Sequence, residues 1–140
     1  MAGYSGRPLA QKLGIKAGMT VIAINRPPTY RRLLGRLPQG TRLSERVVPE
    51  CNFIHFFAIR RRDLETRLPI LRKKLADTGT LWVSWPKKSA RVLTDVTEDV
   101  IREVALPIGL VDTKVCAVDE TWSGLKLMIR RENRKSTTGR

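Results

Sequence analysis

Histidine and cysteine are scarce in this chain, with one histidine and two cysteines among 140 residues. No spacing of the zinc-binding type occurs, so we predict no metal site. Cys51 and Cys116 lie in apolar stretches, which indicates buried, reduced thiols. The single histidine, His55, stands in a strand-like apolar run. We interpret it as a histidine of the core or of a strand edge rather than as a catalytic base.

Long hydrophobic runs are also missing. The longest, residues 53–59, is interrupted by His55 and is far shorter than the roughly 18 residues that a membrane-spanning helix needs. We therefore predict no membrane span. Residues 1–14 mix charged and polar side chains without an apolar stretch, which argues against a secretory signal. A cytoplasmic protein is expected.

Acidic residues are few, because 13 Asp and Glu stand against 27 Lys and Arg and leave a formal net charge of +14. The hydrophobic content of 41% excludes intrinsic disorder, and the chain is too short for two cores. We predict one α/β domain over residues 1–129, followed by a basic, flexible tail over residues 130–140. A field of this sign attracts polyanions such as nucleic acid. No standard nucleic-acid-binding motif is present, so the charge could equally serve solubility alone.

Apolar periodicity predicts the order of the elements. Runs at residues 20–25, 51–59 and 81–85 indicate strands covered by helices on both faces. Leucines spaced by four, three and four predict a helix over residues 62–76, with Pro69 inside it and a turn at residues 77–79. Thr97 is expected to cap a later helix. Residues 110–119 and 121–130 predict an antiparallel hairpin at the sheet edge, with Val115 on its inner face. Shorter helices are predicted at residues 8–13 and 30–34, and a weak strand at residues 41–47.

This order of elements resembles the class I methyltransferase fold. Residues 13–21 (LGIKAGMTV) resemble the entry to the first strand of such proteins, and residues 68–81 (LPILRKKLADTGTL) resemble their helix, turn and fifth strand. Residues 3–15 and 81–134 resemble more closely a small bacterial family known only as a domain of unknown function. The resemblance implies a minimal, three-layer, Rossmann-like α/β fold with a mostly parallel sheet that ends in an antiparallel hairpin. It implies no activity.

The end of the first predicted strand departs from active methyltransferases. Those enzymes have an acidic residue and a glycine-rich turn there, because glycine lets the backbone approach the cofactor closely. This chain has Asn25-Arg26-Pro27-Pro28 instead, and proline both fixes the backbone and lacks an N–H donor. We therefore expect no cofactor, with S-adenosylmethionine disfavoured.

Ligands of open α/β sheets bind beyond the carboxyl ends of the strands. A ligand site is accordingly predicted from polar and aromatic residues near those ends: Asn25, Arg26, Trp85, Lys87, Lys88, Asp119, Glu120 and Trp122. Trp85 beside two lysines suits a planar anion, although Trp82 and Trp85 could instead simply cover helices on opposite faces. Candidate nucleic-acid contacts are the clustered cations Arg60, Arg61, Arg62, Arg130, Arg131, Arg134 and Lys135.

These observations lead to one leading hypothesis and two alternatives. The leading hypothesis is a non-catalytic, methyltransferase-like domain that binds an anionic partner, nucleic acid or a nucleotide, through a basic surface at the strand ends. The first alternative is a divergent S-adenosylmethionine-dependent methyltransferase, or another small-nucleotide enzyme with an altered cofactor turn. The second is a protein-interaction subunit with an exposed hairpin edge.

Overall fold

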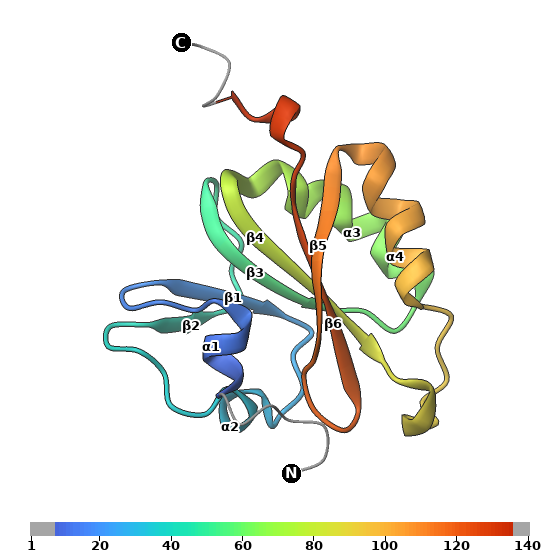
Figure 1. Cartoon of the computed structure of the whole chain (residues 1–140), viewed down its shortest axis with the longest axis horizontal. Coiled ribbons are helices and arrows are strands. Elements are labelled where there is room, and N and C mark those ends of the chain that lie inside the picture. The colour runs from blue at the N-terminus through green and yellow to red at the C-terminus, as the bar shows by residue number, and fades with distance from the viewer. Residues whose placement is uncertain (1–7, 136–140) are drawn as a thin grey trace.

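The computed structural model describes residues 8–135, so the predictions for residues 3–7 and 136–140 lie outside the described part. Its six strands form one sheet in the order β2-β1-β3-β4-β6-β5 (Figure 1). The strands are β1 (Thr20–Ile24), β2 (Arg42–Ser44), β3 (Cys51–Phe57), β4 (Leu75–Pro86), β5 (Leu110–Ala117) and β6 (Trp122–Ile129). Five of these runs lie where the sequence predicts strands, and the predicted weak strand becomes the short edge strand β2.

The sheet is mixed. Strand β1 pairs in parallel with β2 and β3, and β3 pairs in parallel with β4. Strand β6 runs antiparallel to both β4 and β5. The prediction of a mostly parallel sheet is therefore wrong, because the C-terminal hairpin supplies both pairings on one side of β4. The predicted hairpin itself is confirmed.

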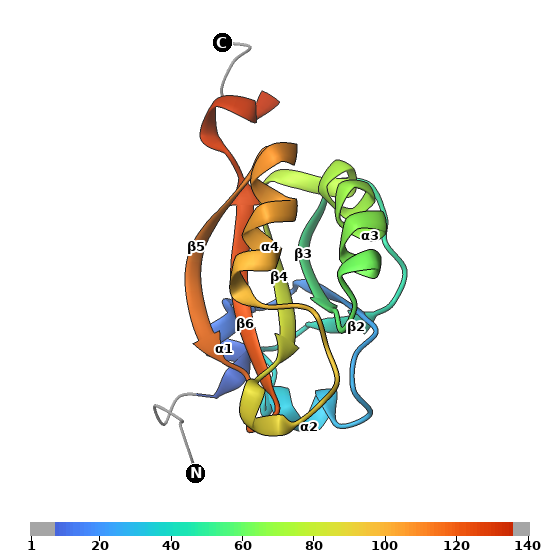
Figure 2. The ribbon, with the colours of Figure 1, turned by 90° about the vertical axis from the view of Figure 1, so that its right-hand side faces the viewer.

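Helices cover both faces of the sheet. Helices α1 (Leu9–Leu13) and α2 (Tyr30–Leu34) pack on one face, and α3 (Arg61–Lys74) and α4 (Glu98–Ala105) pack on the other. Figure 2 shows α1 and α3 on opposite sides of the sheet. This arrangement explains why the central strands are apolar on both faces.

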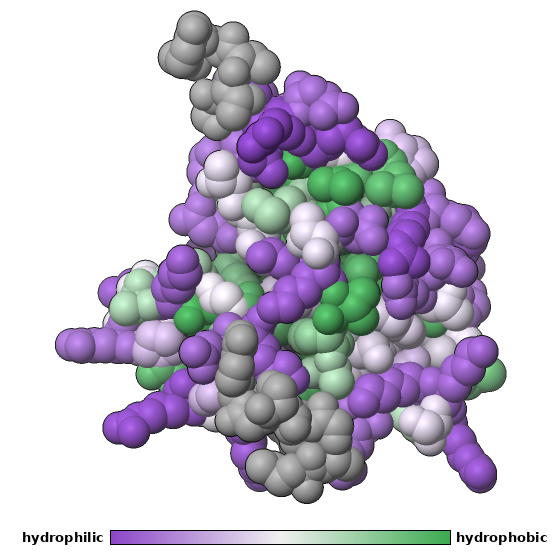
Figure 3. All heavy atoms as spheres, viewed as in Figure 1, coloured by the Kyte–Doolittle hydropathy of each residue, from purple (hydrophilic) through white to green (hydrophobic). Residues whose placement is uncertain are grey.

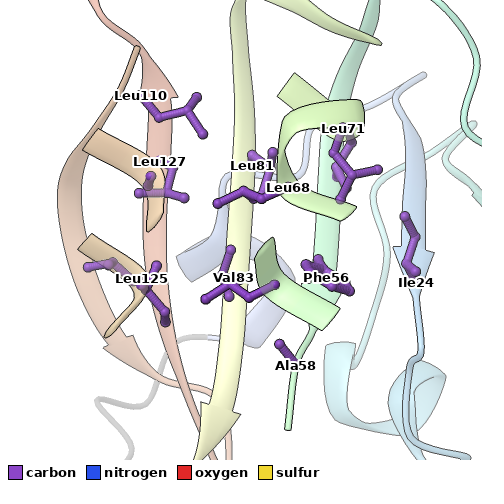
Figure 4. Packing of buried hydrophobic residues seen from close by; sticks show 14 of the residues in the cluster. Ile24, Phe56, Ala58, Leu68, Leu71, Leu81, Val83, Leu110, Leu125 and Leu127 are labelled. Carbon is purple, nitrogen blue, oxygen red and sulfur yellow. The ribbon is translucent and has the colours of Figure 1, made fainter. Parts of the chain in front are cut away.

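The larger core lies between the sheet and α3 with α4. Leu64, Leu68 and Leu71 of α3 are at most 1% exposed. In Figure 4, Leu68 and Leu71 lie over Phe56 of β3 and the neighbouring residues of β4. The leucine spacing thus predicts α3 correctly, and the helix accommodates Pro69 within its length.

Local capping signals are confirmed at α4. The Thr97 side chain accepts a hydrogen bond from the backbone N–H of Val100 at 3.2 Å. After α4, a 3-10 turn (Leu106–Ile108) ends at Gly109, whose φ of 89° is in the left-handed region that glycine adopts readily. The chain then enters β5 directly.

Two local predictions are wrong. Residues 77–79 do not form a turn but belong to β4, where the register to β3 shifts between the Cys51–Leu75 and Phe53–Thr80 pairs. The turn-forming residues are therefore absorbed as a bulge in a longer strand. The second concerns burial: Val115 pairs with the buried Leu125 and so shares its face, as predicted, but the Val115 side chain on the edge strand β5 is 49% exposed.

The two cysteines are not linked to each other. Cys51 is buried and Cys116 is half-buried, and burial raises the pKa of both thiols. Both side chains therefore suit protonated thiols packed among apolar neighbours.

Candidate functional site

The turn after β1 forms one wall of a cavity at the carboxyl edge of the sheet. Asn25 has a φ of 58°, a left-handed conformation that asparagine tolerates, and its side-chain amide donates to the backbone oxygen of Phe57 at 3.4 Å. This bond ties the turn to the end of β3. The cavity has a volume of about 540 Å³ and is lined by Arg26, Pro27, Pro28, Tyr30, Arg31, Leu43 and Glu45.

Two arginines and one carboxylate set the charge of this cavity. Nη2 of Arg26 lies 3.5 Å from a carboxylate oxygen of Glu45, while its Nη1 is buried without a hydrogen-bond partner among the described residues. Arg31 brings a second guanidinium to the same cavity. Because one carboxylate faces two guanidinium groups, the cavity keeps a positive charge that suits an anion.

Glu45 and Arg31 were not predicted as site residues. Both come from elements with weak sequence signals, the three-residue strand β2 and the five-residue helix α2. The predicted weak strand at residues 41–47 included Glu45, whereas β2 ends at Ser44 and leaves Glu45 just beyond the strand, where polar residues that follow parallel strands share one edge of the sheet.

A buried hydrogen-bond network lies beneath this turn. The hydroxyl of Tyr30 bonds Nδ1 of His55 at 2.9 Å, and Nε2 of His55 bonds the hydroxyl of Ser84 at 2.7 Å. All three residues are at most 1% exposed. Each imidazole nitrogen has a partner, which satisfies the polar atoms of a neutral histidine. The interpretation of His55 as a satisfied core histidine is confirmed.

Burial governs the ionisation of this network. Loss of hydration lowers the pKa of His55 to about 3 and raises the pKa of Tyr30, on which nearby Arg26 has a smaller, opposing effect. The histidine is therefore neutral at physiological pH. This neutral network holds α2 against the sheet, and Tyr30 is its one member that also lines the cavity.

The end of β4 meets the hairpin turn. The backbone N–H of Lys87 donates to the oxygen of Thr121 at 2.8 Å, which places the lysine beside the hairpin turn. However, the Asp119 carboxylate accepts hydrogen bonds from the backbone N–H groups of Thr121 and Trp122, so it stabilises the hairpin turn. Glu120 is exposed.

The aromatic residues predicted for this site are engaged in packing. Trp85 is only 9% exposed and lies in the core on the α3 side, whereas Trp82 lies on the opposite face. Trp122 packs edge-on against Phe57, with ring centroids 5.0 Å apart. The structure thus supports the alternative in which Trp85 covers a helix. Lys87 is half-buried and Lys88 is exposed, but the indole of Trp85 is buried and is not accessible to a ligand beside them.

The predicted nucleic-acid contacts divide between two edges of the sheet. Residues 60–62 follow β3 at the carboxyl edge, where Arg61 pairs with Glu65 at 2.8 Å and Glu103 at 2.7 Å. Arg130, Arg131, Arg134 and Lys135 follow β6, which runs antiparallel to β4 and therefore ends at the opposite edge (Figure 1). The two groups do not form one surface.

Comparison with known proteins places most of these elements in one family. A family described as "Protein of unknown function (DUF3052)" matches residues 57–131, from the end of β3 through the C-terminal hairpin. The chain belongs to this family. The match includes Lys87, Lys88 and the hairpin turn, but not the turn after β1 or the cavity beside it. No curated protein matches the chain.

Solved structures show similarity of fold. A structure described as "Structure of a putative methyltransferase from Thermoplasma acidophilum" covers 86% of this chain and 72% of that chain, with a TM-score of 0.56 and 7% identity. Another, described as "A Pericyclic Reaction enzyme", covers 89% of this chain and 47% of that chain, with a TM-score of 0.49 and 11% identity. The first similarity supports a methyltransferase-like fold and nothing about activity.

Residues 8–135 contain no metal-binding cluster and no membrane-spanning helix. No group of three or more His, Cys, Asp or Glu side chains in that part of the chain is placed to hold a metal ion. Within the same residues, no helix combines the length and apolar character that crossing a membrane requires.

Proposed function

We propose that this chain is a non-catalytic domain with a methyltransferase-like fold that binds an anionic partner, nucleic acid, through basic residues at the carboxyl edge of its sheet. The observation that carries the proposal is the turn at residues 25–28. Its prolines and Arg26 line the cavity at the position where a nucleotide cofactor needs close contact with glycine backbone. Positively charged side chains therefore stand at this edge in place of a glycine-rich cofactor-binding turn.

The chemistry of the accessible groups supports binding rather than proton transfer. His55 and Ser84 do not line the cavity, and the hydroxyl of Tyr30, a side chain that is 1% exposed, is already bonded to His55. The cations at this edge include Arg26, Arg31, Lys87 and Lys88, and the Glu45 carboxylate is ion-paired with Arg26. Guanidinium and ammonium groups remain charged at neutral pH and bind phosphate directly.

Fluorescence anisotropy with a labelled 20-base-pair duplex tests this function. We expect binding at about 20 mM salt and a linear fall of log K with log salt concentration, because each phosphate contact releases counterions. Arg26→Gln should weaken binding several-fold, whereas Arg67→Gln on α3, with the same change of charge, should not. Absence of binding by the wild-type protein at this salt concentration would refute the proposal.

A small-nucleotide enzyme is the second candidate, favoured by the cavity of about 540 Å³ beside Glu45. An acidic side chain after a strand can bond ribose hydroxyls in Rossmann-like folds. Thermal unfolding with S-adenosylmethionine or its demethylated product separates the two candidates. A rise in melting temperature at micromolar ligand would support the enzyme and contradict the non-catalytic proposal.

A further inference from the structure

Half of the net charge of this protein comes from a segment that has no acidic residue. Between residues 8 and 44 the sequence contains no aspartate or glutamate, and the first carboxylate is that of Glu45. This segment forms α1, β1 and α2 and leads into β2. It contains seven cationic residues: Lys12, Lys16, Arg26, Arg31, Arg32, Arg36 and Arg42.

The opposite face of the sheet is different, because acidic residues stand among its cations. On α3, Arg61 pairs with Glu65 and with Glu103 of α4. On α4, Arg102 binds Glu98 and Asp99, and it also bonds Asp112 of β5 at 3.0 Å. Helices α3 and α4 together carry seven cationic and five acidic residues, so much of the charge on this side is balanced within the protein itself.

The hairpin adds two lysines to the side of the sheet that α1 and α2 cover. Lys126 of β6 pairs directly with Trp82, whose indole N–H donates to the backbone oxygen of Leu13 in α1 at 2.9 Å. Lys126 also pairs with Lys114 of β5, and directly paired residues project to the same side of a sheet. Both lysines therefore lie on the side of α1. Like charges placed directly opposite each other lower stability, a cost that a bound polyanion relieves.

We name this surface the α1–α2 face and define it by its exposed or half-buried cations: Lys12, Lys16, Arg31, Arg32, Arg36, Lys114 and Lys126. Figure 3 views the molecule from this side and shows hydrophilic residues over much of it, including long side chains beside β1 and β2. The face is also hollowed. A cavity of about 570 Å³ lies between α1 and the segment after α2, with Lys16 and Arg36 in its lining.

We infer that the α1–α2 face docks the phosphate backbone of double-stranded DNA. The inference rests on the proposed function and extends it, because the cavity at Arg26 becomes one border of a wider surface. Single-stranded nucleic acid is bound by stacking bases on accessible aromatic rings. Every aromatic side chain within residues 8–135 is buried or half-buried. Contact with phosphates alone suits a duplex and gives binding that is independent of sequence.

A matched pair of double variants tests the location of the surface. The face variant carries Arg32→Gln and Arg36→Gln, and the control carries Arg67→Gln and Lys73→Gln on α3. All four side chains are exposed, and both variants lose the same charge. At about 100 mM salt we expect the face variant to bind a 20-base-pair DNA duplex at least tenfold more weakly, with a salt slope lower by up to about 1.8. The control should bind within about threefold of the wild type.

A third variant, Lys126→Gln, separates binding from folding. It removes one of two opposed lysines, so its melting temperature should rise while its affinity for DNA falls. Misfolding, by contrast, would lower both the melting temperature and the affinity for DNA.

Three results would overturn the inference. They are equal losses in the face and control variants, unchanged binding by the face variant, or a single strand of the same length that binds more tightly than the duplex. In each case the wild-type protein still binds nucleic acid, so the proposed function would stand. Absence of wild-type binding, by contrast, would remove the proposed function itself.

Discussion

The buried histidine makes the stability of this protein depend on pH in a predictable direction. In the folded state burial lowers the pKa of His55 to about 3, against an ordinary value of 6.5. The unfolded chain therefore binds a proton between these values that the folded protein excludes. The contribution of the neutral histidine to the free energy of unfolding is fully present above pH 6.5 and is lost as the pH falls from 6.5 towards 3.

The expected loss follows from the two pKa values. Each pH unit below 6.5 lowers the free energy of unfolding by about 1.4 kcal/mol, so the change between pH 7 and pH 5 is about 2 kcal/mol. This range is informative because the chain has one histidine and ordinary carboxyl groups titrate below pH 5. Urea unfolding at both pH values, followed by the fluorescence of the buried tryptophans, gives the difference.

His55→Gln provides the reference for this experiment. It is expected to be less stable than the wild type at pH 7, because it replaces a stacked ring that bonds Tyr30 and Ser84, and to lose the pH dependence. If the variant does not fold, the imidazole resonances of the wild type give the same answer, since they should not titrate above pH 4. Equal stability at pH 7 and pH 5, or an imidazole that titrates near pH 6.5, would refute the reasoning.

Three further changes test the packing by urea unfolding at pH 7. Thr97→Ala removes the cap of α4 and should cost about 1 kcal/mol, whereas an unchanged midpoint would contradict the capping role. Leu68→Ala should cost about 2–5 kcal/mol, and Ile70→Ala, at a side chain 56% exposed, should stay within about 0.5 kcal/mol. Gly124→Ala should cost about 1–3 kcal/mol, because its Cβ would lie 3.2 Å from the Trp82 ring and 3.3 Å from Val118, and a neutral result would show that these neighbours move easily.

Local sequence patterns predicted the helices and strands well. The wrong predictions concern features that depend on pairing between distant segments. The leucines of α3 and the cap at Thr97 act within a few residues, so their patterns carry over directly into structure. The sheet type depends instead on where β6 inserts, between β4 and the edge strand β5. The hairpin sequence contains no pattern that predicts which strand β6 will pair with.

The candidate site shows the same division. Asn25 and Arg26 were predicted because they follow an apolar strand, and the structure places Arg26 in the lining of the cavity. The partners of His55 were not predicted, since Tyr30 and Ser84 lie 25 and 29 residues away in the sequence. One signal for the α1–α2 face was available, namely the absence of acids before Glu45. The sequence alone did not predict that α1 and α2, which this segment forms, cover the same face of the sheet.

Backbone amide chemical-shift mapping of the wild-type protein during titration with a DNA duplex tests the central claim most directly. The account predicts that the largest changes occur in α1, in α2 and at Lys114 and Lys126, and that they disappear as salt is added. The largest changes on α3 and α4, or none at low salt, would contradict it.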